Sequence, residues 1–178
     1  MRYFKKIKGE RIYLSPINKE DVVIYTKWLN DYEVSGNLGN YRVLISLNNE
    51  EKTLDRMTSE GHNYAMVLND GDTLIGNISL FDIDNISRRA TLGLFIGEKE
   101  HRGKGYGSEA IRLILDYGFK TLNLHNIMLH VHSDNEMGIA CYKKVGFREF
   151  GRRRESKFKN GQYIEEVHMD ILKSEFYK

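Results

Sequence analysis

The stretch GEKEHRGKGYGSEAIRLILDYGF, Gly97–Phe119, places a glycine-rich loop directly before a helical pattern. Four of its first eleven residues are glycine, and apolar residues then recur at helical spacing over Tyr106–Lys120. The first turn of a helix carries unpaired N–H groups and the positive end of the helix dipole, and glycine lets a ligand approach the backbone. The stretch therefore predicts an anion site, to which Arg102 and Lys104 add positive charge. The alternative is a mobile turn before a capped helix.

The spacing of the glycines excludes two common phosphate-binding motifs. Gly103, Gly105 and Gly107 are spaced G-x-G-x-G, whereas a dinucleotide fingerprint needs G-x-G-x-x-G. A Walker A loop needs a Ser or Thr after its lysine, and here Gly105 follows Lys104. The loop therefore matches neither motif, and the anion site that it predicts belongs to a different class.

The rest of the chain predicts an α/β fold. Strands are expected at residues 10–17, 63–70, 72–84, 86–98, 126–133, 147–159 and 162–172, and helices at 18–29, 48–60, 106–120 and 135–145. Asn30–Arg42 is rich in turn formers and is expected to be a loop. Leu92–Ile96 is continuously apolar, which indicates burial on both faces of its strand. Asp70-Gly71 and Asn160-Gly161 are expected to be hairpin turns. This order predicts a mixed sheet with about four helices, not a doubly wound sheet.

Composition limits the classes of function. The chain has 178 residues with 27 basic and 25 acidic side chains and a net charge of +2, so nucleic acid and membranes are not expected partners. One cysteine excludes an internal disulfide. The chain is expected to be a single domain over residues 1–178. Because the N-terminus lacks a signal-like apolar run, we expect a cytoplasmic protein.

Two motifs together resemble one enzyme family. Arg102-Gly103-Lys104-Gly105-Tyr106-Gly107 follows a predicted strand as Arg-x-x-Gly-x-Gly, and NEMGIACYKKVGF, Asn135–Phe147, follows one strand later. Both resemble the GCN5-related N-acetyltransferases (GNAT family), and in particular the branch with ribosomal-protein N-terminal acetyltransferases and spermidine acetyltransferases. The resemblance implies a mostly antiparallel sheet whose two central strands splay apart.

The resemblance also implies acetyl-CoA as co-substrate. The backbone of the last strand residues before the loop would pair with the pantetheine arm, the loop N–H groups would hold the pyrophosphate, and Asn135 would lie beside the pantetheine. The implied coenzyme-binding residues are Leu94, Phe95, Ile96, Arg102, Gly103, Lys104, Gly105, Tyr106, Gly107, Ser108 and Asn135.

The same resemblance implies direct acetyl transfer to an amine, with Tyr142 as general acid. A phenol with a pKa of about 10 can donate a proton to a departing thiolate at close range. The alternative is that Tyr142 is an ordinary half-buried helix residue. Relatives often have a glutamate base at the position of Thr91, which cannot serve as one, and a serine at the position of Gly138. The general base is therefore left open.

The acceptor is expected to be a small polyamine-like or antibiotic-like amine, or a protein N-terminus. Asp31, Glu33 and Tyr41 are the candidate acceptor residues, and either carboxylate could also receive the proton through water. His130 and His132 share one strand face, and we expect a hydrogen-bonded pair near the surface rather than a metal site.

Other interpretations stay open at this point. One is a non-catalytic coenzyme-binding sensor, which Thr91 and Gly138 favour. Another is a nucleic-acid-binding domain using Arg152–Arg154, which the charge balance disfavours. Edge strands in the closing hairpin allow a homodimer.

Overall fold

The computed structural model describes residues 2–39, 41–59 and 61–178. One sheet contains its eight strands: β1 (Ile7–Lys8), β2 (Ile12–Pro16), β3 (His62–Leu68), β4 (Leu74–Asp84), β5 (Arg89–Ile96), β6 (Asn126–His132), β7 (Arg148–Lys159) and β8 (Gln162–Leu172). Their spatial order is β1-β2-β3-β4-β5-β6-β8-β7. Neighbours are antiparallel except β5 and β6, which run parallel. The predicted mixed, mostly antiparallel sheet is confirmed.

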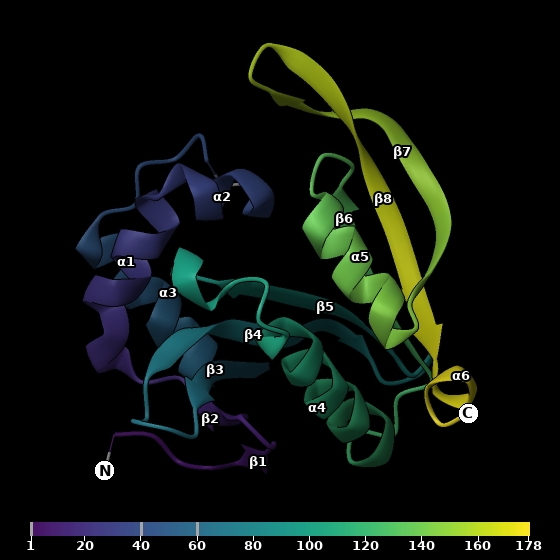
Figure 1. The fold of residues 1–178 in the computed structure, drawn as a ribbon, viewed down its shortest axis with the longest axis horizontal. Coiled ribbons are helices and arrows are strands. Elements are labelled where there is room, and N and C mark those ends of the chain that lie inside the picture. Colours follow the sequence, from purple (N-terminus) through teal and green to yellow (C-terminus); the bar gives the residue numbers. More distant parts are fainter. Residues whose placement is uncertain (1, 40, 60) are drawn as a thin grey trace.

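Helices cover both faces of the sheet (Figure 1). They are α1 (Val22–Asn30), α2 (Tyr32–Leu38), α3 (Leu47–Ser59), α4 (Tyr106–Lys120), α5 (Glu136–Val145) and α6 (Lys173–Phe176), with 3-10 turns at Lys19–Asp21 (η1) and Lys99–His101 (η2). Alternate residues of a strand face opposite sides. Accordingly Ile12 and Leu14 of β2 pack in the core under α4, whereas Tyr13 packs in a second core under α1 and α3.

The central strands separate where the predicted coenzyme edge lies. β5 pairs with β6 only at Arg89–Thr91, opposite Asn126–Met128, although β4 pairs with β5 as far as Ile96. The edge of β5 that faces β6 therefore has no strand partner after Thr91. This confirms the expected splay, and it corrects the prediction that Leu92–Ile96 is buried on both faces. Leu92 is buried, but the four residues after it are only half-buried because β6 has diverged.

Most other predicted elements are confirmed to within two or three residues. The helix over Tyr106–Lys120 has the predicted bounds, and Asn160 and Gly161 both adopt positive φ in the last hairpin turn. The strand predicted at residues 86–98 is shorter than expected, at Arg89–Ile96. Glu60, the predicted end of the second helix, lies outside the described residues.

The predicted loop Asn30–Arg42 is partly wrong, because it contains helix α2. The Asp31 side chain caps this helix by accepting a hydrogen bond from the N–H of Glu33 at 2.9 Å, and Gly39 ends it in the left-handed conformation. These are ordinary start and stop signals. Gly36 within the helix weakens the helical pattern, and Asn40 lies outside the described residues.

The tip of the β7–β8 hairpin reaches the region of α2 (Figure 1). Tyr32 Oη donates a hydrogen bond to Asn160 Oδ1 at 2.6 Å. Arg42 Nη2 donates to the carbonyl of Phe158 at 2.6 Å, and the Tyr41 hydroxyl donates to the same carbonyl. We call these contacts the hairpin–α2 bridge. The bridge joins the hairpin to the region of α2, and both elements contribute residues to the cleft described below.

Candidate active site

A cleft of about 650 Å³ lies where β5 and β6 separate. Its walls come from the end of β5, the glycine loop, α5, α2 and the sheet face formed by β6 and β8. Predicted site residues among its lining are Leu94, Phe95, Ile96, Arg102, Gly103, Gly105, Gly107, Ser108, Asn135, Tyr142 and Glu33. The structure therefore brings most of the predicted coenzyme residues to one cavity. Lys104 and Tyr106 belong to the same loop but are not part of that lining.

The loop before α4 presents a row of free backbone donors. Gly103 and Gly105 have φ of 73° and 86°, a conformation that glycine adopts without strain. The N–H groups from Gly103 to Ser108 have no hydrogen-bond acceptor within the described part of the chain. The N–H of Arg102, by contrast, donates to the carbonyl of Lys99 at 3.0 Å. A row of free N–H groups at a helix N-terminus is a built anion site, and here it starts at Gly103.

Gly97, the first glycine of the stretch, has a different role. A Cβ at this position would overlap the indole ring of Trp28. The Trp28 ring nitrogen also donates a hydrogen bond to Glu98 at 3.0 Å. Gly97 is therefore required because the chain passes directly over the buried tryptophan, which fixes where the loop leaves β5.

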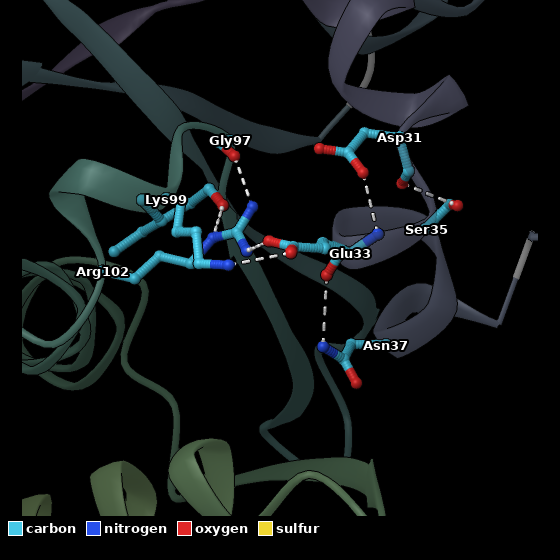
Figure 2. A network of polar contacts seen from close by, with 8 residues as sticks. Asp31, Glu33, Ser35, Asn37, Gly97, Lys99 and Arg102 are labelled. Atoms are coloured by element: carbon cyan, nitrogen blue, oxygen red, sulfur yellow. Dashed lines mark hydrogen bonds and ion pairs between the residues drawn. The ribbon is translucent and has the colours of Figure 1, made fainter.

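The Arg102 side chain joins three parts of the site (Figure 2). Its guanidinium donates to the carbonyls of Ile96 at 3.2 Å and Gly97 at 2.6 Å, and Nη1 lies 3.1 Å from a carboxylate oxygen of Glu33. Lys99 contacts the other carboxylate oxygen of Glu33 at 2.9 Å. These contacts hold the pKa of Glu33 below its ordinary value, first through the Lys99 hydrogen bond and then through Arg102. Arg102 thus braces the loop against α2 with its side chain instead of pointing at the free N–H groups.

Arg11 supports the loop from the opposite side. It donates to the carbonyl of Lys104 at 2.9 Å, pairs with Glu109 at 3.0 Å and stacks on the ring of Tyr106 at 5.0 Å. The sequence prediction missed Arg11, which lies far from the loop along the chain. No local pattern could have linked the two segments.

Helix α5 begins and ends on the residues of the second motif. Asn135 is its N-cap and accepts a hydrogen bond from the N–H of Gly138 at 2.9 Å, and Gly146 ends it with φ of 118°. A Cβ on Gly138 would lie 2.7 Å from the Asn135 side-chain nitrogen. Gly138 therefore leaves room for the cap, which gives a physical reason for glycine at this position.

Tyr142 lies on α5 and lines the cleft. Burial raises the pKa of its phenol above the ordinary value, and the neighbouring Cys141 adds to the shift. Its hydroxyl has no hydrogen-bond partner within the described residues. Cys141 Sγ lies 3.3 Å from Ser108 Oγ, which connects α5 to the first turn of α4. A protonated, unengaged phenol therefore faces the cleft beside the free N–H row.

Of the three predicted acceptor residues, Glu33 alone lines the cleft. Asp31 is used as the cap of α2, and Tyr41 is used in the hairpin–α2 bridge. Thr91 lies at the last paired position of β5, opposite Met128, and is buried. The structure thus separates Asp31, Tyr41 and Thr91 from the cavity lining.

Strands β6, β7 and β8 supply polar residues that the sequence prediction did not place. His130, His132, Lys157 and Glu166 all line the cleft. The expected hydrogen-bonded histidine pair near the surface is wrong. His130 is exposed, whereas His132 is 4% exposed and its Nδ1 atom has no hydrogen-bond partner among the described residues. Alternation along β6 predicts the shared face, but which end of the strand is covered depends on α2 and β7.

Two further observations concern metals and membranes. Within the residues described, no group of three or more His, Cys, Asp or Glu side chains is arranged to hold a metal ion. No helix in the same residues is long and apolar enough to cross a membrane.

Known proteins are similar to this chain in sequence and in fold. The family model described as acetyltransferase (GNAT) domain matches residues 11–148. The spermidine N(1)-acetyltransferase of Vibrio cholerae serotype O1 is 41% identical over 103 residues, which are 58% of this chain and 59% of that protein. An uncharacterized N-acetyltransferase of Bacillus licheniformis, p20, is 27% identical over 94% of this chain and 96% of its own length. Thus the match to the Vibrio protein covers less than two thirds of that relative.

The fold comparison extends over nearly the whole chain. The crystal structure of spermidine N-acetyltransferase from Vibrio cholerae in complex with CoA and spermine superposes with a TM-score of 0.84. The superposition covers 96% of this chain and 100% of that chain at 28% identity. The family expected from the loop and the later helix is confirmed by these matches.

Proposed function

This chain belongs to the GNAT acetyltransferase family, and we propose that it transfers the acetyl group of acetyl-CoA directly to a primary amine. One observation carries the proposal. The free N–H groups of Gly103–Ser108 stand at the mouth of a cleft that also contains Tyr142 and the unpaired edge of β5. Acetyl-CoA carries a diphosphate that suits the free N–H groups, and a thioester that suits Tyr142 and the unpaired edge of β5.

The chain offers partners for the diphosphate, the pantetheine arm and the thioester of the coenzyme. The N–H groups of Gly103–Ser108 would hold the diphosphate, because free donors at a helix N-terminus favour anions. The unpaired edge of β5 at Leu94 and Phe95 would pair with the amides of the pantetheine arm as a neighbouring strand does. Asn135 lines the same wall at the start of α5. Backbone donors at this edge would also polarise the thioester carbonyl.

Tyr142 would act as the general acid. Burial keeps its phenol protonated at neutral pH, since its pKa is raised. A proton held at Oη can pass to the sulfur as the C–S bond breaks, which avoids release of a free thiolate. The free hydroxyl supports this role, because no protein acceptor among the described residues competes for its proton.

The charges in the cleft favour an acceptor with a single amine. The lining contains two carboxylates, Glu33 and Glu166, and three cations, Arg102, Lys144 and Lys157. Glu33 is already paired with Lys99 and Arg102, and Glu166 lies 3.6 Å from Lys157. A polycation such as spermidine needs several unpaired carboxylates to offset its charge. We therefore propose a small monoamine or a peptide N-terminus as the acceptor, although the similar Vibrio enzyme is named for spermidine.

Thermal unfolding with added coenzyme tests the binding half of the proposal. Coenzyme A at about 100 times its Kd should stabilise the protein by about 2.7 kcal/mol. Pantetheine, which lacks the diphosphate, is the matched ligand and should give a much smaller shift at the same concentration. Equal shifts with the two ligands, or none with either, would contradict the assigned loop.

A release-of-thiol assay tests the transfer half. The panel is benzylamine, spermidine and the dipeptide Ser-Ala, each with acetyl-CoA. We expect thiol release with benzylamine or Ser-Ala and less with spermidine. Binding of coenzyme A without turnover of any member would instead support the non-catalytic sensor.

A further inference from the structure

His132 is the most unusual titratable group of the cleft. Its side chain lies at the end of β6 and is almost fully buried, yet Nδ1 has no hydrogen-bond partner in the described part of the chain. A buried polar atom without a partner costs about 1–3 kcal/mol, so each one needs an explanation. Four side chains carry such an atom among the described residues, and His132 is the one of them that lines the cleft. Nε2 lies on the side of α2, 3.7 Å from the position that a Cβ on Gly39 would take.

Charged groups from three segments surround the ring. Glu166 of β8 is the direct cross-strand partner of His132 and is itself 6% exposed. Asp134 follows β6, and Lys157 and Lys159 belong to β7. Asp134 is paired with Lys159 at 2.7 Å, whereas Glu166 is 3.6 Å from both Lys157 and His168. Glu166 is therefore the carboxylate that both lines the cleft and lies directly opposite His132 in the strand pairing.

The surroundings of the His132 ring favour its neutral form. Burial is the largest cause that lowers the pKa of His132, and the two lysines lower it further against the opposing effects of Asp134 and Glu166. A neutral imidazole with an unused nitrogen can accept a proton. The other candidates are worse placed, because Glu33 is held by two cations and Thr91 has no group that titrates near neutral pH.

We propose that His132 accepts the proton of the attacking amine, and that Glu166 offsets the charge which the imidazole then acquires. This inference rests on the proposed acetyl transfer and supplies its missing base. The amine nitrogen forms a bond to the acetyl carbon while the C–S bond breaks. The His132 ring first takes one proton from the substrate ammonium, and the Tyr142 hydroxyl gives its proton to the sulfur as the C–S bond breaks. The second N–H proton, which is lost as the amide forms, restores the Tyr142 phenol, and the imidazolium of His132 then releases its proton to solvent, so that atoms and charge balance without any further reactant.

The pH profile of His132→Gln is the first test, with the same three-amine panel. Wild-type kcat should fall as the pH drops below the ordinary imidazole value of about 6.5. In His132→Gln, kcat at pH 7 should fall by about 100-fold or more. It should then rise steadily toward the pKa of the amine, because only amine that has already lost its proton reacts. His125→Gln, an exposed histidine outside the cleft lining, is the matched control and should leave the profile unchanged.

Glu166→Gln gives a readout that a purely structural role would not produce. Since the Glu166 charge raises the pKa of His132, its removal should move the acid limb of the profile to lower pH. We expect kcat to fall about tenfold in the same variant, because a buried imidazolium would lose its counter-charge. A direct NMR titration of the His132 ring should show the same downward shift in the protein without substrates.

Three other outcomes would overturn the inference, and only one of them would also overturn the proposed function. An unchanged kcat and pH profile in a folded His132→Gln protein overturns the inference and leaves the acetyltransferase proposal standing. A loss in His130→Gln that matches or exceeds the loss in His132→Gln also overturns it. Absence of turnover in wild type with all three amines overturns the proposed function and this step together. Circular dichroism and thermal unfolding of each variant show that the fold is retained.

Discussion

Arg102 and Glu33 connect the glycine loop before α4 to helix α2, with Nη1 of the arginine 3.1 Å from Oε2 of the glutamate. The same guanidinium also holds the carbonyls of Ile96 and Gly97 at the end of β5. One side chain therefore contacts both α2 and the segment that leads from β5 into the glycine loop (Figure 2).

Arg102→Ala should weaken coenzyme A binding by about tenfold or more. The variant removes two charge-assisted hydrogen bonds to backbone carbonyls, each worth about 1.5–3 kcal/mol when the donor is charged. Glu33→Gln is the matched control because it keeps both carbonyl contacts of Arg102 and removes only the ion pairs of the half-exposed Glu33 with Arg102 and Lys99. It should change coenzyme affinity by less than about threefold. Calorimetric titration with coenzyme A measures both, and equal losses in the two variants would contradict the brace.

Tyr142→Phe should lower kcat by about 100-fold and leave the coenzyme KM within about twofold. The substitution removes the proton donor but keeps the ring that packs against Phe147. Because burial raises the pKa of Tyr142, wild-type kcat should show no loss from this group up to its ordinary value of about 10. Steady-state kinetics across pH provide the measurement. A kcat within about threefold of wild type would remove Tyr142 from catalysis.

Gly97→Ala should destabilise the protein by about 2–3 kcal/mol. The new methyl would overlap the Trp28 ring, and overpacking a well-filled core carries a cost of that size. For a chain of this length the melting temperature should drop by about 5–10 °C. Gly151→Ala is the control, because nothing lies within 4 Å of the position that its new methyl would take, and it should stay within about 0.5 kcal/mol of wild type. Differential scanning calorimetry distinguishes the two.

Asn135→Ala should cost about 1 kcal/mol of stability through loss of the α5 cap. Asn135→Asp keeps an oxygen that can accept from the N–H of Gly138, so its stability should remain near wild type. If the amide nitrogen of Asn135 also contacts the coenzyme, Asn135→Asp should still raise the coenzyme KM. Urea unfolding measures the cap, and an equal loss of stability in both variants would argue against it.

The wild-type protein should lose stability relative to His132→Gln as the pH falls from about 7.5 to about 5.5, a window that spans the ordinary imidazole pKa. Burial lowers the pKa of His132 in the folded state, so the unfolded chain takes up a proton first, near pH of about 6.5. The stabilising contribution is present above that value and is lost as the pH falls toward the folded-state pKa. The loss is at most about 1.4 kcal/mol for each pH unit. Comparing the two proteins by urea unfolding cancels the other titrating groups, and parallel pH curves would refute the shift.

Those parts of the fold and site that depend on local pattern can be predicted from the sequence. Alternation and capping locate the strands and helix α4, and the two motifs locate the glycine loop and helix α5. Helix α2 escapes such a prediction because its start and stop signals, Asp31 and Gly39, surround a short and polar segment. Even so, these are the residues that bring Glu33 to the cleft.

The acceptor side cannot be predicted in this way, because it depends on contacts between distant segments. Strand alternation alone leaves His132 near the surface, since it cannot show that α2 and β7 cover the end of β6. Glu166 lies in a strand that mixes polar and apolar residues, so the sequence pattern does not predict that its side chain lines the cleft. Arg11 contacts Lys104, which is 93 positions away in the chain. Such contacts arise from register across the sheet and not from neighbours in the sequence.

The hairpin–α2 bridge joins two segments that are far apart in the sequence. Tyr32 and Asn160 are 128 positions apart in the chain. The bridge therefore forms only after the segment of α2 and the distant β7–β8 hairpin have come together, which carries the entropy cost of closing a long loop. The elements from β5 to α5, which would hold the coenzyme under the proposed function, are by contrast consecutive in the chain. We therefore expect substitutions that weaken this bridge to change access to the α2 side of the cleft while the consecutive elements from β5 to α5 keep their positions.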